Sequence, residues 1–355
     1  MEKRRRTIGH SLLLGLLVLA GCGGGDDDHL ELAYGVIRDE LPSRIVVIND
    51  EGKDALRVTA GRLGSVTSLP VWSPDGRRIA FVRYNAVAGS GGRGTNFEVH
   101  VVNADGTGER RIGRGSSPRW TSDGRFLVVE RAGRATRSSD IYVLRADGSG
   151  QRRLTAGSSP VPAHRGSRIA FVRYVYRLDA NGECCIVVSS ALDTISLDGT
   201  GLRNLARITR PGTHFSQPDW LPDDSAVSAV ERTDVAVAGR LVTFSRTSGR
   251  RVIVPNVGEA YDWSPRGDRL AYTYGGSSFI ARSNGTALRT FSGIDAFDVN
   301  WSPDGREIAL SVNDDPVSNR RVGIYVAAAD EDRPRRVATE QGSAAYVDWR
   351  PTTQP

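Results

Sequence analysis

The sequence predicts an all-β fold, and three observations lead to that prediction. Glycine makes up 40 of the 355 residues, about 11% where ~7% is usual. All six tryptophans lie in copies of one short phrase, in which a turn-forming group follows the indole. Asp-Gly and Asn-Gly pairs recur between strand-like runs, and such pairs are strong hairpin signals. Many short strands joined by tight turns account for all three observations.

The tryptophan phrase predicts the first two strands of a repeat. In the form Trp-Ser-Pro-Asp-Gly, a strand ends at Trp and a type I turn follows, because Pro pre-sets φ and Gly accepts the left-handed position. The runs after the turn are almost entirely apolar, which is typical of a strand covered on both faces. The six copies are residues 71–76, 119–124, 219–224, 262–267, 300–305 and 348–351.

A seventh, degenerate copy of the phrase lies at residues 162–166. It is recognisable because Arg168–Arg173 repeats the letters of Arg78–Arg83. Successive copies are about 38 to 58 residues apart, which is the range of repeat lengths found in propeller blades.

The second turn predicts a third and a fourth strand in each repeat. Four sheet strands per repeat, arranged radially, make a β-propeller. The first–second and third–fourth turns of an antiparallel sheet share one end, which we call the turn face, and the irregular connections lie at the other end, the loop face. The clearest second turns are residues 105–106, 147–148, 198–199 and 284–285.

The two ends of the chain predict how the ring closes. Residues 346–351 are a first strand with no second, third or fourth strand after it. Residues 32–37, 45–48 and 56–59 are those three strands without a first. The count balances if the C-terminal strand completes the N-terminal blade, which gives seven four-stranded blades. A six-bladed ring, with the copy at residues 162–166 absorbed into a loop, is the alternative.

The repeat resembles the WD-like repeat of TolB-type propeller proteins. Residues 120–155 carry the likeness most clearly, with Trp-Thr-Ser-Asp-Gly, then Ile-Tyr-Val, then Ala-Asp-Gly and Arg-Arg-Leu-Thr. The resemblance covers roughly residues 30–351 and implies a β-propeller. The propeller of TolB itself has six blades, which is the alternative count for this chain. TolB also has an N-terminal α/β domain that this sequence lacks, so no role of that domain is transferred.

The first 30 residues resemble a bacterial lipoprotein signal. A basic segment (Lys3 to Arg6) precedes an apolar run, Leu12–Ala20, that is too short to span a bilayer comfortably. The run ends in Leu-Ala-Gly-Cys, a lipobox match, so we expect cleavage after residue 21 and acylation of Cys22. Residues 22–29 then form a flexible tether and residues 30–355 the propeller, lipid-anchored on the periplasmic side or the outer face of a bacterial membrane. The alternative is an ordinary secretory signal with Cys22 incidental.

A substitution of Cys22 tests the anchor. We expect Cys22→Ser to leave the chain uncut or to release it as soluble material, because the acylated thiol is lost. Detergent phase partitioning measures this directly. If the wild-type chain and the variant both enter the aqueous phase, the lipobox interpretation is wrong.

The charge of the chain argues against a nucleic-acid partner. The net charge is +6, and residues 1–21 contribute four basic residues and one acidic residue, so cleavage leaves 6 − 3 = +3. The remaining Arg, Asp and Glu are spread along the chain without a basic block. Nucleic-acid binding is therefore not expected.

Motif searches predict no enzyme, no cofactor and no metal site. There is no G-x-S-x-G, and no histidine pair has H-E-x-x-H spacing. His29 falls in the tether, and His100 and His164 are interpreted as structural. The Asp-Gly turns offer single carboxylates without the distal Glu of a calcium loop. Cys184 and Cys185 could form a strained vicinal disulfide, but two reduced thiols on opposite faces of a strand are favoured.

These features together predict a monomeric, non-enzymatic binding scaffold. We expect it to engage a cell-envelope protein or peptide, or an envelope glycan, through the loop face, because binding usually resides in variable loops on a rigid scaffold. The alternatives are a propeller-funnel enzyme of lactonase or sugar dehydrogenase type, and an extracytoplasmic sensor domain. Polar residues just before the tryptophans could line the upper channel or hydrogen-bond to the neighbouring blade. The candidate partner-binding residues are Arg119, His214, Asp219, Asp262, Asn300 and Asp348.

Overall fold

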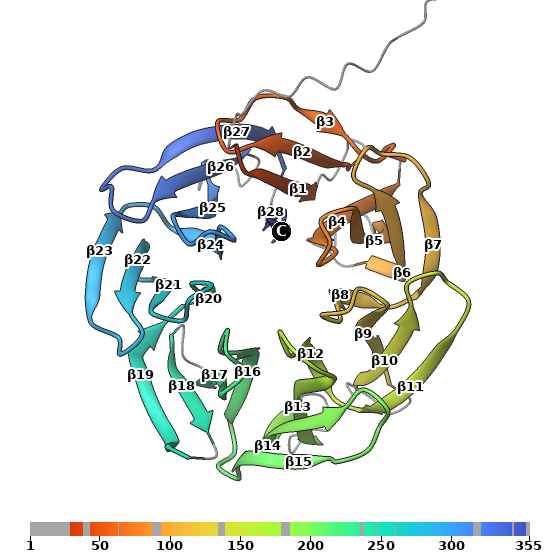
Figure 1. The fold of residues 1–355 in the computed structure, drawn as a ribbon. Coiled ribbons are helices and arrows are strands. Elements are labelled where there is room, and N and C mark those ends of the chain that lie inside the picture. Colours follow the sequence, from red (N-terminus) through yellow and green to blue (C-terminus); the bar gives the residue numbers. More distant parts are fainter. Residues whose placement is uncertain are drawn as a thin grey trace, which may run out of the picture.

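The chain folds as a seven-bladed β-propeller (Figure 1). The computed structural model describes residues 29–352, apart from residues 38–42, 63, 87–93, 134–138, 179–184, 235–237, 246, 259, 315–320 and 343. Within these residues there are 28 strands and no helix, and the strands form seven four-stranded antiparallel sheets. The prediction of seven blades is confirmed and the six-bladed alternative is wrong, because residues 158–162 begin a blade of their own.

The first four blades run in chain order from the inner strand outward. Blade 1 is β4 (Ser65–Trp72), β5 (Arg78–Ala86), β6 (Gly94–Asn103) and β7 (Arg110–Arg114). Blade 2 is β8 (Ser116–Trp120), β9 (Phe126–Ala132), β10 (Ser139–Arg145) and β11 (Gln151–Ala156). Blade 3 is β12 (Ser158–Pro162), β13 (Arg168–Leu178), β14 (Cys185–Ser196) and β15 (Arg203–Ile208). Blade 4 is β16 (Thr213–Trp220), β17 (Ala226–Thr233), β18 (Gly239–Ser245) and β19 (Gly249–Val257).

The last three blades include the one that closes the ring. Blade 5 is β20 (Tyr261–Trp263), β21 (Arg269–Tyr274), β22 (Ser277–Arg282) and β23 (Ala287–Ser292). Blade 6 is β24 (Ala296–Trp301), β25 (Glu307–Asn313), β26 (Arg321–Ala328) and β27 (Arg335–Gln341). Blade 7 is β28 (Ala344–Trp349), β1 (Glu31–Ile37), β2 (Ile45–Asn49) and β3 (Leu56–Arg57).

The C-terminal strand closes the ring as predicted. β28 pairs antiparallel with β1, in a register that places Trp349 opposite Leu32 and Ala344 opposite Ile37. The blade that begins the described chain is thus completed by the strand that ends it, which removes two open sheet edges.

The tryptophan phrase folds as the expected turn. In the first copy, Gly76 N–H donates to the carbonyl of Ser73 (2.8 Å), and Gly76 has φ +63°. The Ser73 hydroxyl donates to Asp75 Oδ1 (2.5 Å), and the backbone N–H of Arg77 donates to the same oxygen (3.1 Å). Side-chain bonds therefore fix the turn that Pro and Gly allow.

The core lies between the blades. One cluster joins Ala80 and Val101 of blade 1 to Trp120, Leu127 and Leu144 of blade 2, all of them buried. Each tryptophan side chain is buried in such a cluster, where its ring fills the space between two sheets. The repeating phrase therefore supplies the packing that holds neighbouring blades together.

Indole N–H groups also form hydrogen bonds between neighbouring blades. Trp120 Nε1 donates to the carbonyl of Val71 (3.0 Å), and Trp349 Nε1 donates to that of Asn300 (3.1 Å). In both cases the acceptor is the residue just before the preceding blade's tryptophan, so these bonds tie β8 to β4 and β28 to β24.

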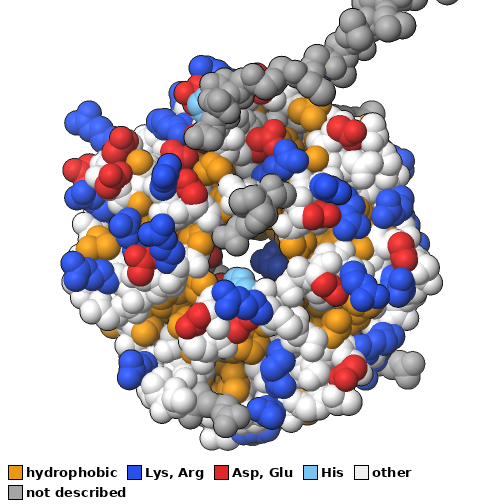
Figure 2. All heavy atoms as spheres, viewed as in Figure 1, with side chains coloured by type: hydrophobic (Ala, Val, Ile, Leu, Met, Phe, Trp, Pro, Cys, Tyr) orange, Lys and Arg blue, Asp and Glu red, His pale blue; other side chains and the backbone are white. Residues whose placement is uncertain are grey.

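The face seen in Figure 2 has a central opening, and acidic and basic side chains are interspersed around it. Among the described residues, no helix is long and apolar enough to cross a membrane. The predicted signal, Cys22 and Cys184 lie outside the described residues, and Cys185 is described only as the first residue of β14.

Candidate functional site

The inner strands gather polar side chains at the ring centre. Side chains alternate along a strand, so a tryptophan that points between blades leaves the residue before it facing the other way. Arg119 is exposed, and the others are half-buried. The ring-centre residues are Arg119 on β8, Asp219 on β16, Asp262 on β20, Asp298 and Asn300 on β24, and Asp348 on β28.

Electrostatic coupling shows that these residues lie close together. The positive charge of Arg119 lowers the pKa of Asp298 and of Asp348. The negative charges of Asp219, Asp298 and Asp348 raise the pKa of Asp262. The structure therefore brings five of the six predicted residues, together with Asp298, to one place.

Three of the carboxylates also tie the blades together. Asp348 Oδ2 accepts the backbone N–H of Trp72 (2.7 Å), and Asp262 Oδ2 accepts that of Trp301 (2.6 Å). Asp298 Oδ2 accepts the N–H of Val347 (3.0 Å). Each bond runs to the next blade, so these residues face the centre and also link neighbouring blades. The two alternatives from the sequence, lining the channel and hydrogen-bonding to the neighbouring blade, therefore both apply.

Asp219 differs from the other three carboxylates. Its Oδ1 accepts the N–H of Trp220, its own neighbour in the chain (2.9 Å). Within the part of the chain that the structure describes, its side chain makes no hydrogen bond to another blade. Asp219 is therefore the ring-centre carboxylate least occupied by structural bonds.

Burial at the ring centre raises the pKa of all four carboxyl groups. It raises the pKa of Asp298 to about 6 and that of Asp348 to about 7. The pKa of Asp262 lies well above the usual range, through burial first and then through the negative charge of Asp219. Burial also raises the pKa of Asp219. Near neutral pH the cluster therefore holds protonated carboxyls, which can donate a proton, and ionised ones, which can accept it.

Tyr261 extends the cluster with a neutral hydrogen-bond donor. Its hydroxyl donates to the carbonyl of Gln217 (2.6 Å) and lies 3.1 Å from the hydroxyl of Ser228. Burial and then the charge of Asp219 raise the pKa of Tyr261 well above 10. The phenol therefore stays protonated at any ordinary pH.

His214, the one candidate that does not directly precede a tryptophan, lies outside this cluster. It is the second residue of β16, six residues before Trp220 and thus about 20 Å along the strand. Its Nδ1 lies 3.0 Å from Asp234 Oδ1, and its ring meets that of Tyr174 edge-on. It sits at the loop-face end of the strand.

Asp298 is the ring-centre carboxylate that the sequence analysis missed. It lies three residues before Trp301, and the search took only the residue immediately before each tryptophan. Alternation places Asp298 and Asn300 on the same side of β24. The same two-residue period would have found it.

His164 and His100 make contacts typical of structural residues. The backbone N–H of His164 donates to Asp224 Oδ1 (2.9 Å), and its Nε2 lies 3.3 Å from the carbonyl of Trp220. His100 lies 3.3 Å from Glu109 and stacks on Phe81. Among the described residues, no group of three or more His, Cys, Asp or Glu is placed to hold a metal ion.

Comparison with known proteins places the chain by its fold. No family model matches the sequence, and no curated protein matches it. Solved structures that resemble it include an oligogalacturonate lyase in complex with manganese, with a TM-score of 0.62 and 15% identity over 84% of this chain and 85% of that one. An oligogalacturonate lyase from Vibrio parahaemolyticus has a TM-score of 0.56 and 11% identity, covering 86% and 95%.

A prolyl endopeptidase is also similar, with a TM-score of 0.59 and 12% identity over 90% of this chain. This chain covers 50% of that peptidase's length. Identities this low show a common fold alone. The fold defines the chain as a seven-bladed β-propeller. The similar structures named here are propellers of lyases and peptidases, so the resemblance is not specific to TolB. The manganese of the lyase has no matching donor set among the residues described here.

The prediction that this chain is not an enzyme is contradicted by these comparisons. The named neighbours are lyases and peptidases, and one lyase chain is covered over 95% of its length by the propeller. The prediction rested on missing local motifs. A propeller site is assembled from inner strands whose starts are 35 to 55 residues apart in the chain, so a local motif search does not reveal it.

Proposed function

We propose that the protein is an enzyme that cleaves a glycosidic bond in a neutral or amino-bearing oligosaccharide at the ring centre. The observation that carries this proposal is the convergence of four carboxyl groups with raised pKa beside one guanidinium. Perturbed carboxyls cluster at sites of acid–base chemistry. The fold of the oligogalacturonate lyases supports a sugar substrate for a propeller of this length.

Asp262 and Asp219 have suitable environments for acid and base. Oδ2 of Asp262 accepts the Trp301 N–H, so its proton resides on Oδ1, from which it passes to the leaving glycosidic oxygen as the C–O bond breaks. Asp219 is less occupied by structural bonds, and its ionised form takes a proton from the water whose oxygen bonds to the anomeric carbon. General acid–base catalysis of this kind contributes about 10²- to 10⁴-fold.

The charge balance selects the substrate class. Among the described residues, four carboxyl groups and one arginine, Arg119, are gathered at the centre. A polyuronate would therefore meet repulsion there, while a neutral sugar or a protonated amino sugar would not. This differs from the oligogalacturonate named for the lyases. A lactonase or a sugar dehydrogenase is less favoured: a metal or quinone in such an enzyme is ringed by converging ligands, and among the described residues no group of three or more His, Cys, Asp or Glu is placed to hold a metal ion.

The place we propose for this activity is the bacterial cell envelope. The support is the lipobox match at Cys22 and the basic and apolar segments before it. An envelope glycan would then be the substrate within reach of a tethered propeller.

The test is an assay of the purified full chain on labelled cello-, malto- and chito-oligosaccharides, with oligogalacturonate for comparison. We expect cleavage of a neutral or amino-bearing oligomer, and we expect Asp219→Asn and Asp262→Asn each to lower kcat by about 100-fold or more. Asp105→Asn, an exposed turn residue, is the matched control and should retain activity. Cleavage confined to oligogalacturonate, undiminished activity in both variants, or no cleavage of any oligomer contradicts the proposal.

A further inference from the structure

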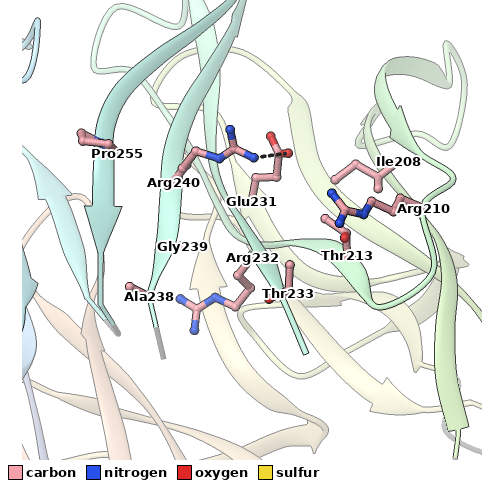
Figure 3. Close-up of a pocket in the computed structure, with 10 residues that line it drawn as sticks. All are labelled: Ile208, Arg210, Thr213, Glu231, Arg232, Thr233, Ala238, Gly239, Arg240 and Pro255. Atoms are coloured by element: carbon pink, nitrogen blue, oxygen red, sulfur yellow. Dashed lines mark ion pairs between the residues drawn. The ribbon is translucent and has the colours of Figure 1, made fainter. Parts of the chain in front are cut away.

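The loop face carries two pockets at the same position in different blades. The blade-4 pocket has a volume of about 300 Å³ and lies where β17 ends and β18 begins, beside the connection that enters β16 (Figure 3). The blade-1 pocket has a volume of about 460 Å³ and lies where β5 ends and β6 begins, beside the connection that enters β4. The two blades lie on opposite sides of the ring (Figure 1).

An arginine occupies the same turn in both pockets. Arg210 lies three residues before the start of β16, and the N–H of Thr213 donates to its carbonyl (3.2 Å). Arg62 lies three residues before the start of β4, and the N–H of Ser65 donates to its carbonyl, also at 3.2 Å. No other blade has an arginine at this position, where the residues are Gly113, Thr155, Gly258, Gly293 and Gln341.

Residues of opposite charge face each other across two strands at the same register in both pockets. Glu231 is opposite Arg240 in blade 4, and Arg83 is opposite Glu98 in blade 1. Arg83 and Glu231 each pair with the third residue of their inner strand, so the positions are equivalent and the charges are exchanged.

Each pocket has three arginines and one glutamate, a balance of 3 − 1 = +2. In the blade-4 pocket the arginines are Arg210, Arg232 and Arg240. In the blade-1 pocket they are Arg62, Arg83 and Arg114.

Some of these guanidinium groups are held by hydrogen bonds or ion pairs within the protein, and others have N–H donors that bond to no described residue. Arg83 is buried and paired with Glu109, and Arg232 Nη2 donates to the carbonyl of Gly258 (2.9 Å). The guanidinium groups of Arg62 and Arg210 make no hydrogen bond or ion pair with any residue in the described part of the chain. In Figure 3, Arg210 points toward the gap beyond which Arg240 pairs with Glu231 (3.5 Å).

We propose that the blade-1 and blade-4 pockets each bind one anionic group of a small ligand, a carboxylate, sulfate or phosphate. The planar fork of an unpaired guanidinium matches the oxygens of such a group. Both volumes lie in the range of small-molecule sites. The chain then binds two anions on one face, and this inference shares no residue with the ring-centre site.

The experiment is calorimetric titration of the full chain with inorganic phosphate, D-glucuronate and, as the uncharged control, D-glucose. We expect two anions per chain for the wild type, and one each for Arg62→Gln and Arg210→Gln. The double variant should bind at least about tenfold more weakly, since a hydrogen bond to a charged group is lost at each site. A preference for phosphate or for glucuronate identifies the source of the anionic group.

Three controls keep the result interpretable. Arg266→Gln, an exposed arginine in a turn-face loop, should bind as the wild type does. Asp219→Asn should also bind both anions, which separates this inference from the proposed enzyme activity. Thermal melting within a degree or two of the wild type shows that the variants fold. Unchanged binding by the double variant or equal binding of glucose would overturn the proposal. So would the absence of anion binding by the wild type when the anion is at low-millimolar concentration and in 10-fold molar excess over the protein.

Discussion

Deleting residues 344–355 is expected to lower the midpoint of thermal unfolding by roughly 10 °C or more. The deletion removes β28, the inner strand of blade 7, with its pairing to β1. It also removes the buried ring of Trp349, whose loss alone costs about 3–5 kcal/mol. Asp348, which accepts the Trp72 N–H of blade 1, is lost as well. The ring is then open on both sides of the missing strand.

Differential scanning calorimetry measures this effect. Deletion of residues 353–355 alone is the matched control, because it leaves β28 intact. Trp349→Ala in the full chain separates the packing of the ring from the pairing of the strand. A chain lacking residues 344–355 that melts within a degree or two of the wild type would show that ring closure contributes little to stability.

Stability is expected to fall as the pH rises from 5 to 8. The folded-state pKa is about 6 for Asp298 and about 7 for Asp348, and an unfolded Asp has a pKa of about 3.9. Between these values the folded chain binds protons that the unfolded chain has released. The stabilisation is therefore complete below about pH 4 and is lost as the pH passes through 6 and 7. The expected loss is on the order of a few kcal/mol.

Urea unfolding at pH 5, 6.5 and 8 checks the prediction. The double variant Asp298→Asn/Asp348→Asn should show a flatter dependence, because an amide oxygen still accepts the backbone N–H groups without carrying a charge. Hydrogen bonds from Ser149 to Asp147 lower the pKa of that turn aspartate, so its opposite effect falls below this pH range. Greater stability of the wild type at pH 8 than at pH 5 would show that the ionised carboxylates are the favoured form.

The architecture follows from local sequence. Each tryptophan phrase specifies a strand end and a turn, and Ser73, Asp75 and Gly76 form that turn through bonds within a few residues. Counting first strands against hairpins then gave seven blades and the pairing of β28 with β1. These predictions were confirmed because short, repeated segments specify the strands and turns. The C-terminal inner strand has no second strand after it in the chain, and the N-terminal blade is the one that lacks an inner strand.

The chemistry of the ring centre was decided by tertiary structure. Asp219, Asp262 and Asp348 come from three different blades, and only ring closure brings the charges of Asp219 and Asp348 close enough to raise the pKa of Asp262. A polar residue before a tryptophan can face a channel, bond to the next blade or do both, and the sequence does not choose among these. Strand order and turns depend on neighbours in the chain, whereas the acidity of a buried group depends on which distant charges surround it and how much water is excluded.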